Sequence, residues 1–319
     1  MFPVPLCFDR GVRLSRVISA LLLTAAVGAG LVGSVQVALL LTTSAAVDVG
    51  WWVLVLVCLA LGLYAKRSSL LVRLLAVEEP GAHRARGRTV WFLVMAMVLL
   101  IAGLKLSSAD ADAYKRLLFG EGGLVEWSQV VVLVGAIRTA WVIGSGLKTH
   151  LPVAWPSWMY RGLAVLLGFL LMEELAWGQV IFGWQTPESI RVMNAQEETT
   201  LHNLGWFQDR LDAVTFFATV VILLLVVLLP RLAPRLVRDR SFETRSAVMT
   251  LLPPTYVWPL FLFVVAMAYG VANRSFSDVI YNRDQEWGEL VLYGSGLLVL
   301  LRTRVLLGSS KKLPLKASL

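Results

Sequence analysis

Acidic and amide side chains recur inside apolar segments of this sequence, where ionisable groups are costly. Six of them stand out: Glu126, Gln129, Glu173, Glu174, Glu286 and Glu289. A charged side chain near the centre of a bilayer costs about 2.5–3.5 kcal/mol on insertion scales. Each occurrence therefore indicates either a polar partner or a function.

The spacing of these residues predicts which of them share a helix face. Glu126 lies three residues before Gln129, and Glu286 lies three residues before Glu289. Side chains at i and i+3 are neighbours on a helix surface, so each pair presents its polar groups together. Glu173 and Glu174 are adjacent and point about 100° apart, which predicts different partners for the two.

A short pattern of Trp, a small residue and then Gln or Glu occurs three times. It occurs at 127–129, 177–179 and 287–289. Trp177 and Gln179 belong to the second occurrence. All three are predicted to lie toward the outer part of a span. The Trp and small residues have a structural explanation there as well, because Trp is common at the membrane interface and small residues let helices pack closely.

Arg138 is the one basic residue assigned to neither side of the membrane, because it lies in the interior of a predicted span. Counted from the nearest basic residue at the cytoplasmic end of each helix, Arg138, Glu173, Glu174 and Glu289 lie about 15–20 Å into the membrane. An unpaired charge at that depth is expensive, so we expect Arg138 to pair with one of these glutamates.

The long polar segment 183–210 supplies His202, the only histidine not assigned to the cytoplasmic side, and the neighbouring Asn203. Too few histidines are present for a zinc site on the outer side or for a haem held by two membrane-embedded histidines. Carboxylate and amide oxygens suit Mg²⁺, Ca²⁺ or Mn²⁺, with His202 as a possible further ligand. The glutamates alternatively hold a shared proton, because several buried carboxylates cannot all ionise together.

The composition determines the class of protein that must position these residues. Of 319 residues, 57% are hydrophobic and only 16% are charged, with a mean hydropathy of +0.72. Long apolar runs recur throughout, which predicts an all-α polytopic membrane protein. A cytosolic enzyme, a secreted disulfide scaffold and a nucleic-acid-binding domain are excluded.

Eight spans of about 20 residues are predicted within a single integral-membrane domain, 1–319. They are 17–43, 49–65, 89–106, 124–147, 159–182, 211–230, 247–272 and 285–306, with 183–210 as a long outer loop. Of the 29 basic residues, 21 fall on one side, so both termini are assigned to the cytoplasm. The expected location is a bacterial cytoplasmic (inner) membrane.

Three functions remain open. The first is an integral-membrane enzyme acting on a lipid or lipid-linked substrate, with Glu173, Glu174 and His202 as catalytic residues. The other candidate site residues would bind substrate or form a relay: Glu126, Gln129, Arg138, Trp177, Gln179, Asn203, Glu286 and Glu289. The second is a proton- or cation-coupled transporter or channel, and the third is a non-catalytic scaffold subunit. Membrane lipids are the expected partners; protein partners stay open, and no nucleic acid is expected.

Overall fold

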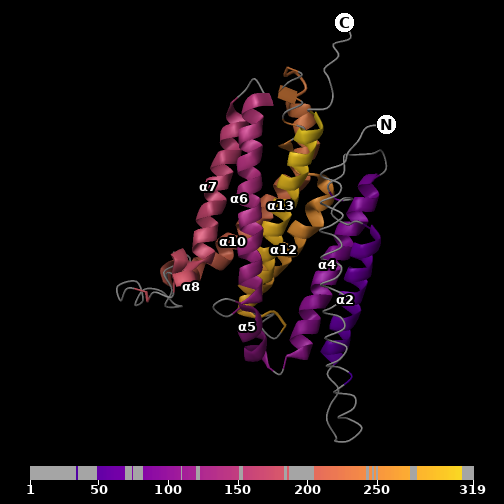
Figure 1. Ribbon diagram of the computed structural model, residues 1–319, viewed down its shortest axis with the longest axis vertical. Helices are drawn as coiled ribbons and strands as arrows, with labels where there is room; N and C mark the ends of the chain where they lie inside the picture. The colour runs from indigo at the N-terminus through magenta and orange to yellow at the C-terminus, as the bar shows by residue number, and fades with distance from the viewer. Residues whose placement is uncertain are drawn as a thin grey trace, which may run out of the picture. The chain divides into compact units, whose positions relative to one another are not determined.

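The computed structural model shows an all-helical chain (Figure 1). It describes residues 49–68, 82–119, 123–150, 154–186, 205–241, 251–273 and 279–310, apart from residues 109, 183 and 184, together with a few isolated positions. By contacts the chain divides into two compact units, 1–116 and 117–319. The second unit holds all the candidate site residues.

The first unit contains a pair of packed helices, α2 (Val49–Ser68) and α4 (Ala82–Ser107). Tyr64 on α2 links the two, because its hydroxyl hydrogen-bonds the Thr89 hydroxyl at 2.7 Å and its ring lies 4.6 Å from that of Phe92. The short helix α5 (Ala111–Phe119) follows and leads into the second unit.

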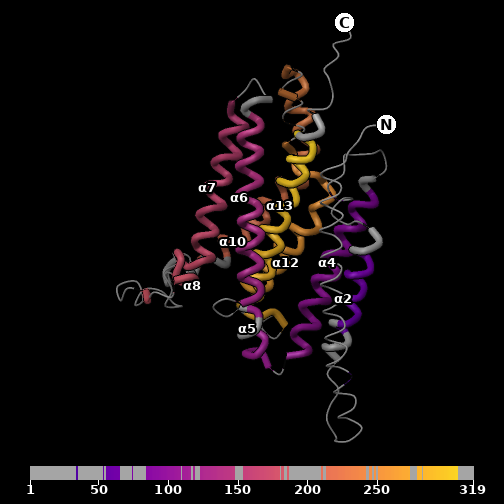
Figure 2. Tube along the Cα trace, in the orientation of Figure 1, coloured from indigo at the N-terminus to yellow at the C-terminus, as the bar shows by residue number. Residues whose placement is uncertain are grey.

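The second unit is a bundle in which each helix packs against the next in the order α7, α6, α13, α12, α10 (Figure 2). These helices are α6 (Leu124–His150), α7 (Trp155–Glu174), α10 (Gly205–Leu236), α12 (Trp258–Ala272) and α13 (Gln285–Ser310). The central position of α13 brings it against both α6 and α12.

Small residues let α6 and α7 approach closely. A side chain added at Gly144 would lie 3.0 Å from the Ser157 carbonyl oxygen, and the Ser157 hydroxyl donates to the Gly144 carbonyl at 2.6 Å. Ala140 on α6, Ala164 on α7 and Leu300 on α13 belong to one buried cluster nearby. Close backbone approach of this kind is how helices associate inside a membrane.

The helix ends nearest the candidate site residues gather at one end of the bundle. Gln129, near the start of α6, bonds Glu286, near the start of α13, so these two helices run parallel. Glu174 at the end of α7 bonds Tyr293 of α13, so α7 runs the opposite way. The Phe216 ring near the start of α10 lies 5.7 Å from Tyr269 near the end of α12. These directions agree with the predicted alternation of the spans.

The prediction of an all-α polytopic membrane protein is confirmed. Within the described ranges, five helices are long and apolar enough to cross a membrane: Arg84–Ser107, Leu124–Leu147, Ala213–Leu236, Thr255–Ala272 and Gln285–Leu307. Helices α2 and α7 overlap two further predicted spans, while the predicted span 17–43, apart from Ser34, lies outside the described residues. The cytoplasmic placement of the termini and the single domain stay predictions.

Two predicted spans differ from the helices observed. The fifth, predicted to reach residue 182, breaks after Glu174 because Ala176, Trp177 and Gly178 have φ angles of 44°, 56° and 98°. The break is followed by the 3₁₀ turn η1 (Ala176–Gly178) and the short helix α8 (Gln179–Phe182). The seventh, predicted from residue 247, starts late because Pro254 is extended ahead of η2 (Thr255–Val257) and α12.

Candidate functional site

Three carboxylates meet where the ends of α7 and α13 come together. Glu174, Glu286 and Glu289, which we call the carboxylate cluster, each place a carboxylate oxygen within 4.8 Å of the others. Glu286 is buried, whereas Glu174 and Glu289 are partly exposed. Glu286 is therefore the most deeply buried of the three.

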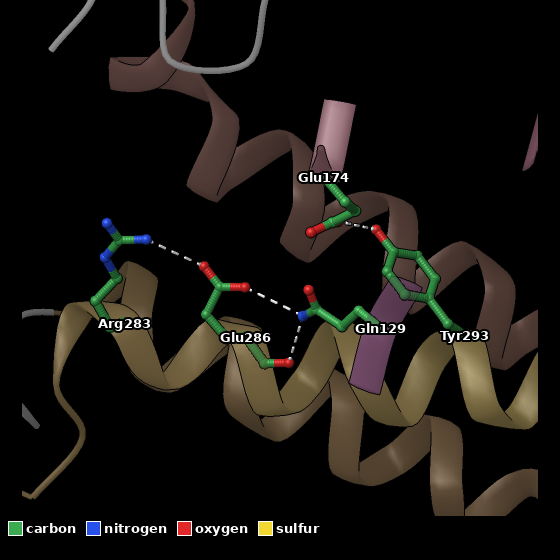
Figure 3. Close-up of polar contacts among 5 residues, drawn as sticks. All are labelled: Gln129, Glu174, Arg283, Glu286 and Tyr293. Atoms are coloured by element: carbon green, nitrogen blue, oxygen red, sulfur yellow. Dashed lines mark hydrogen bonds and ion pairs between the residues drawn. The ribbon is translucent and has the colours of Figure 1, made fainter. Parts of the chain in front are cut away.

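Glu174 is held by a tyrosine on the neighbouring helix. The Tyr293 hydroxyl donates to Oε1 of Glu174 at 2.9 Å (Figure 3). A hydrogen bond to an ionised carboxylate is stronger than one between neutral groups. Glu174 is the last residue of α7, so no further helical turn supports its side chain. The bond to Tyr293 fixes the carboxylate instead.

Gln129 of α6 closes the cluster from the third helix. Its Nε2 donates to the Glu286 backbone carbonyl at 3.0 Å and to Oε2 of Glu286 at 3.1 Å. The side chain is fully buried, yet its Oε1 accepts no hydrogen bond. Figure 3 shows this oxygen pointing toward the space between the carboxylates of Glu286 and Glu174.

One cation lies beside the carboxylate cluster. Nη1 of Arg283 lies 3.4 Å from Oε1 of Glu286, and the turn η4 (Asn282–Asp284) holds Arg283 just ahead of α13. The buried Asp284 fixes that turn by accepting the Tyr281 backbone N–H at 2.7 Å. With all three glutamates ionised, one guanidinium leaves two negative charges uncompensated.

Glu173 takes a different partner from Glu174, as its place on the next helix face predicts. Its Oε1 accepts the Trp177 indole N–H at 2.6 Å, and the Trp177 ring packs edge-on against Phe169 at 5.7 Å. The left-handed turn after α7 brings Trp177 back to this carboxylate. Glu173 therefore supports the turn rather than joining the carboxylate cluster.

The remaining polar candidates lie around this centre or outside the described residues. Gln179 accepts a hydrogen bond from the Thr186 hydroxyl at 3.1 Å. Glu126 lies one turn before Gln129 on α6 and is half-buried. His202 and Asn203 lie outside the described residues, so their predicted closure of the site stays a prediction.

The expected pairing of Arg138 with a glutamate is not seen. Arg138 is exposed, and no ion pair joins it to another residue of the described ranges. It lies nine residues after Gln129, which rotates it about 180° around α6 and moves it about 13.5 Å along the helix. Arg138 therefore faces away from the carboxylate cluster.

Arg138 and Glu173 also lie at different levels of the bundle. The predicted depths place Lys148 and Arg161 at one level, but Gly144 is the residue of α6 that lies against Arg161, because a Cβ at Gly144 would lie 3.0 Å from the Arg161 Cγ. Arg138 is then six residues, or about 9 Å, from that level, whereas Glu173 is twelve residues, or about 18 Å, away.

Two members of the site are not among the predicted site residues. The i+7 spacing predicts that Tyr293 shares a helix face with Glu286, and the bond from Tyr293 to Glu174 places it at the site. Arg283 precedes Glu286 by three residues, the spacing of a helical ion pair. It lies just before the predicted span 285–306, so the search for charges inside spans does not include it.

The site brings together oxygen donors that could hold one cation or one shared proton. Three carboxylates so close repel one another when all are ionised, so a positive charge must be shared among them. The donors are hard oxygens, which excludes a preference for soft metals. Comparisons with models of known protein families, with curated proteins and with solved structures found no match.

Proposed function

We propose that this chain is an integral-membrane enzyme acting on a lipid or lipid-linked substrate at the outer leaflet of a bacterial cytoplasmic membrane. The observation that carries the proposal is the position of the carboxylate cluster at one end of the bundle. Glu286 and Glu289 are one and four residues from the start of α13, or about 1.5 and 6 Å along its axis. Reactive groups at that depth meet lipid headgroups rather than acyl chains.

An apolar surface lies close to this polar site in the chain. Ile181 and Phe182, a few residues beyond Glu174, are 54% and 71% exposed, and Trp177 between them and the cluster is 36% exposed. An amphiphilic substrate needs a polar site for its head and an adjoining apolar surface for its chains. This pairing favours a lipid over a water-soluble metabolite.

Glu174 is the residue we assign as general base. It is partly exposed, and the Tyr293 hydroxyl orients it, so it can accept a proton from water or from a substrate hydroxyl. Glu289, also partly exposed, is positioned to return a proton. His202 and Asn203 are proposed to contact the substrate from the 183–210 loop.

A transporter is the second candidate because of one cavity. A space of about 30 Å³ lies among α10, α12 and α13, and its lining includes Glu289, Gln285 and Thr219. That volume exceeds what one water molecule needs. Glu289 thus belongs to the carboxylate cluster and also lines this mainly apolar space, an arrangement that also suits a proton or cation relay.

Lipid turnover separates the two functions. The protein is reconstituted in nanodiscs with a total lipid extract of its host, and lipids are followed by mass spectrometry. We expect one lipid class to be converted by the natural protein and by Asp239→Asn, an exposed carboxylate far along the chain, and not by Glu174→Gln. Unchanged lipids, with cation flux in liposomes that Glu289→Gln abolishes, would contradict the enzyme and favour the transporter.

A further inference from the structure

We propose that the carboxylate cluster is a binding site for one hard divalent cation of the Mg²⁺, Ca²⁺ and Mn²⁺ class. The ligands would be a carboxylate oxygen each from Glu174, Glu286 and Glu289, with Oε1 of Gln129 as the fourth protein donor. Only the role of the cation in turnover rests on the proposed function. The binding of the cation does not, because it is measured without substrate.

The spacing of the donors fits a single ion. Two oxygens on opposite sides of Ca²⁺ lie about 4.6–5.2 Å apart, and around Mg²⁺ about 4.0–4.2 Å, twice the metal–oxygen distance. The three carboxylate oxygens lie within 4.8 Å of one another. Three oxygens 4.8 Å apart surround a centre about 2.8 Å from each, slightly beyond the Ca²⁺–oxygen distance of about 2.3–2.6 Å. Small side-chain rotations would therefore bring all three into contact with one cation.

The buried amide of Gln129 points independently to a ligand. Its Nε2 is fully used in bonds to Glu286, while its fully buried Oε1 has no hydrogen-bond partner and points between the carboxylates of Glu174 and Glu286. Leaving a buried acceptor without a partner is unfavourable, because it has lost its hydrogen bonds to water and gained none in return. A cation between Gln129 and the glutamates would satisfy that oxygen.

The charges of the site favour a divalent ion. Glu174, Glu286 and Glu289 carry three negative charges when ionised, and Arg283 beside Glu286 offsets one. Glu126 and Glu173 lie close enough to add to the negative charge around Glu174. A divalent cation offsets two of the remaining charges, whereas a single shared proton offsets only one. The protein supplies four donors, so a six- to eight-coordinate ion keeps positions for water or for substrate oxygens.

The structure also contains the outer shell that metal ligands require. Tyr293 hydrogen-bonds the Glu174 carboxylate, and Arg283 hydrogen-bonds that of Glu286. Such outer partners orient ligands, and their removal typically weakens metal affinity 10- to 100-fold. The Arg283 guanidinium has no free lone pair and so cannot bind the metal itself. The protein ligands are therefore all oxygen atoms.

Mn²⁺ serves as the probe because it is paramagnetic. The full-length protein in nanodiscs is stripped with EDTA and titrated with Mn²⁺ while free Mn²⁺ is measured by electron paramagnetic resonance. We expect one Mn²⁺ per chain, displaced by Ca²⁺ or Mg²⁺. Glu174→Gln and Glu289→Gln should each weaken binding by at least 10- to 100-fold, and Asp239→Asn should bind as the natural protein does.

Thermal unfolding of the same samples shows whether each variant is folded, so that lost Mn²⁺ binding is not mistaken for misfolding. Without metal, Glu289→Gln should melt at a higher temperature than the natural protein, because it removes repulsion. Mn²⁺ should raise the melting temperatures of the natural protein and of Asp239→Asn, and should raise those of the two Gln variants much less. Equal Mn²⁺ binding by both Gln variants, or no binding by folded natural protein at millimolar Mn²⁺, would overturn the site. Stoichiometric binding without lipid turnover would instead reject the proposed function and leave the cation site standing.

Discussion

The Tyr293 hydroxyl of α13 donates a hydrogen bond of 2.9 Å to the carboxylate of Glu174, the last residue of α7. This contact joins two helices that are separated by α10 and α12 along the chain. It also holds a carboxylate that lies just ahead of a left-handed turn and so lacks the support of a continuing helix.

Removing only the Tyr293 hydroxyl tests its orienting role. We expect Tyr293→Phe to lower the free energy of unfolding by about 1.5–3 kcal/mol, the range for a hydrogen bond to a charged group. Mn²⁺ affinity should fall about 10- to 100-fold. Calorimetry and Mn²⁺ titration measure the two effects. Lost stability with unchanged Mn²⁺ affinity would show that the bond only joins the helices.

Two glycines of α6 should respond to alanine in opposite ways. A Cβ at Gly144 would lie 3.0 Å from the Ser157 carbonyl oxygen, whereas one at Gly146 would meet nothing within 4 Å. We expect Gly144→Ala to destabilise the bundle by about 1–3 kcal/mol through overpacking. Gly146→Ala should stabilise it by up to about 1 kcal/mol through helix propensity. Thermal unfolding compares them, and equal effects would contradict the close contact of α6 with α7.

Arg138 should be dispensable for the stability of the bundle. Because its side chain is exposed, we expect Arg138→Leu to change the free energy of unfolding by no more than about 0.5 kcal/mol. A broken buried ion pair would cost about 3–5 kcal/mol instead. A loss of that size in denaturant titration would restore the carboxylate partner that the sequence predicted.

The end of the bundle that carries the carboxylate cluster should face outward. In a background with Cys7 and Cys58 replaced by Ser, we expect Gln185→Cys to react with a membrane-impermeant maleimide in intact cells. Ser241→Cys, which follows the Arg-rich end of α10, should react only after lysis; both side chains are exposed. The reason is the excess of Lys and Arg on the cytoplasmic side. The reverse pattern would invert the topology.

Much of the fold followed from the sequence because membrane helices are determined by local composition. Apolar length predicted α6 and α13 to within a few residues at their starts. The i and i+3 spacing also predicted that Glu286 and Glu289 share a face, and Gln129 joins them from α6. These are properties of single helices that need no knowledge of packing.

What the sequence did not predict depends on contacts between helices. The break after Glu174 lies in an apolar stretch and places Ala176 and Trp177, neither of them glycine, at positive φ angles. The Trp177–Glu173 bond that accompanies it forms only in the folded chain. Arg138 was misplaced because counting residues gives depth but not direction around the helix axis. Which face of α6 is buried is decided by Ala140, Ile143 and Leu147 packing against α7 and α13.

The most direct measurement is a crystal structure of the Mn²⁺-loaded protein with data collected at the manganese absorption edge. We predict one anomalous peak in the bundle, about 2.0–2.5 Å from carboxylate oxygens of Glu174, Glu286 and Glu289, with the Gln129 amide oxygen turned toward it. A fully folded bundle with no anomalous peak among these three glutamates, or with the glutamates on separate faces, would contradict the account.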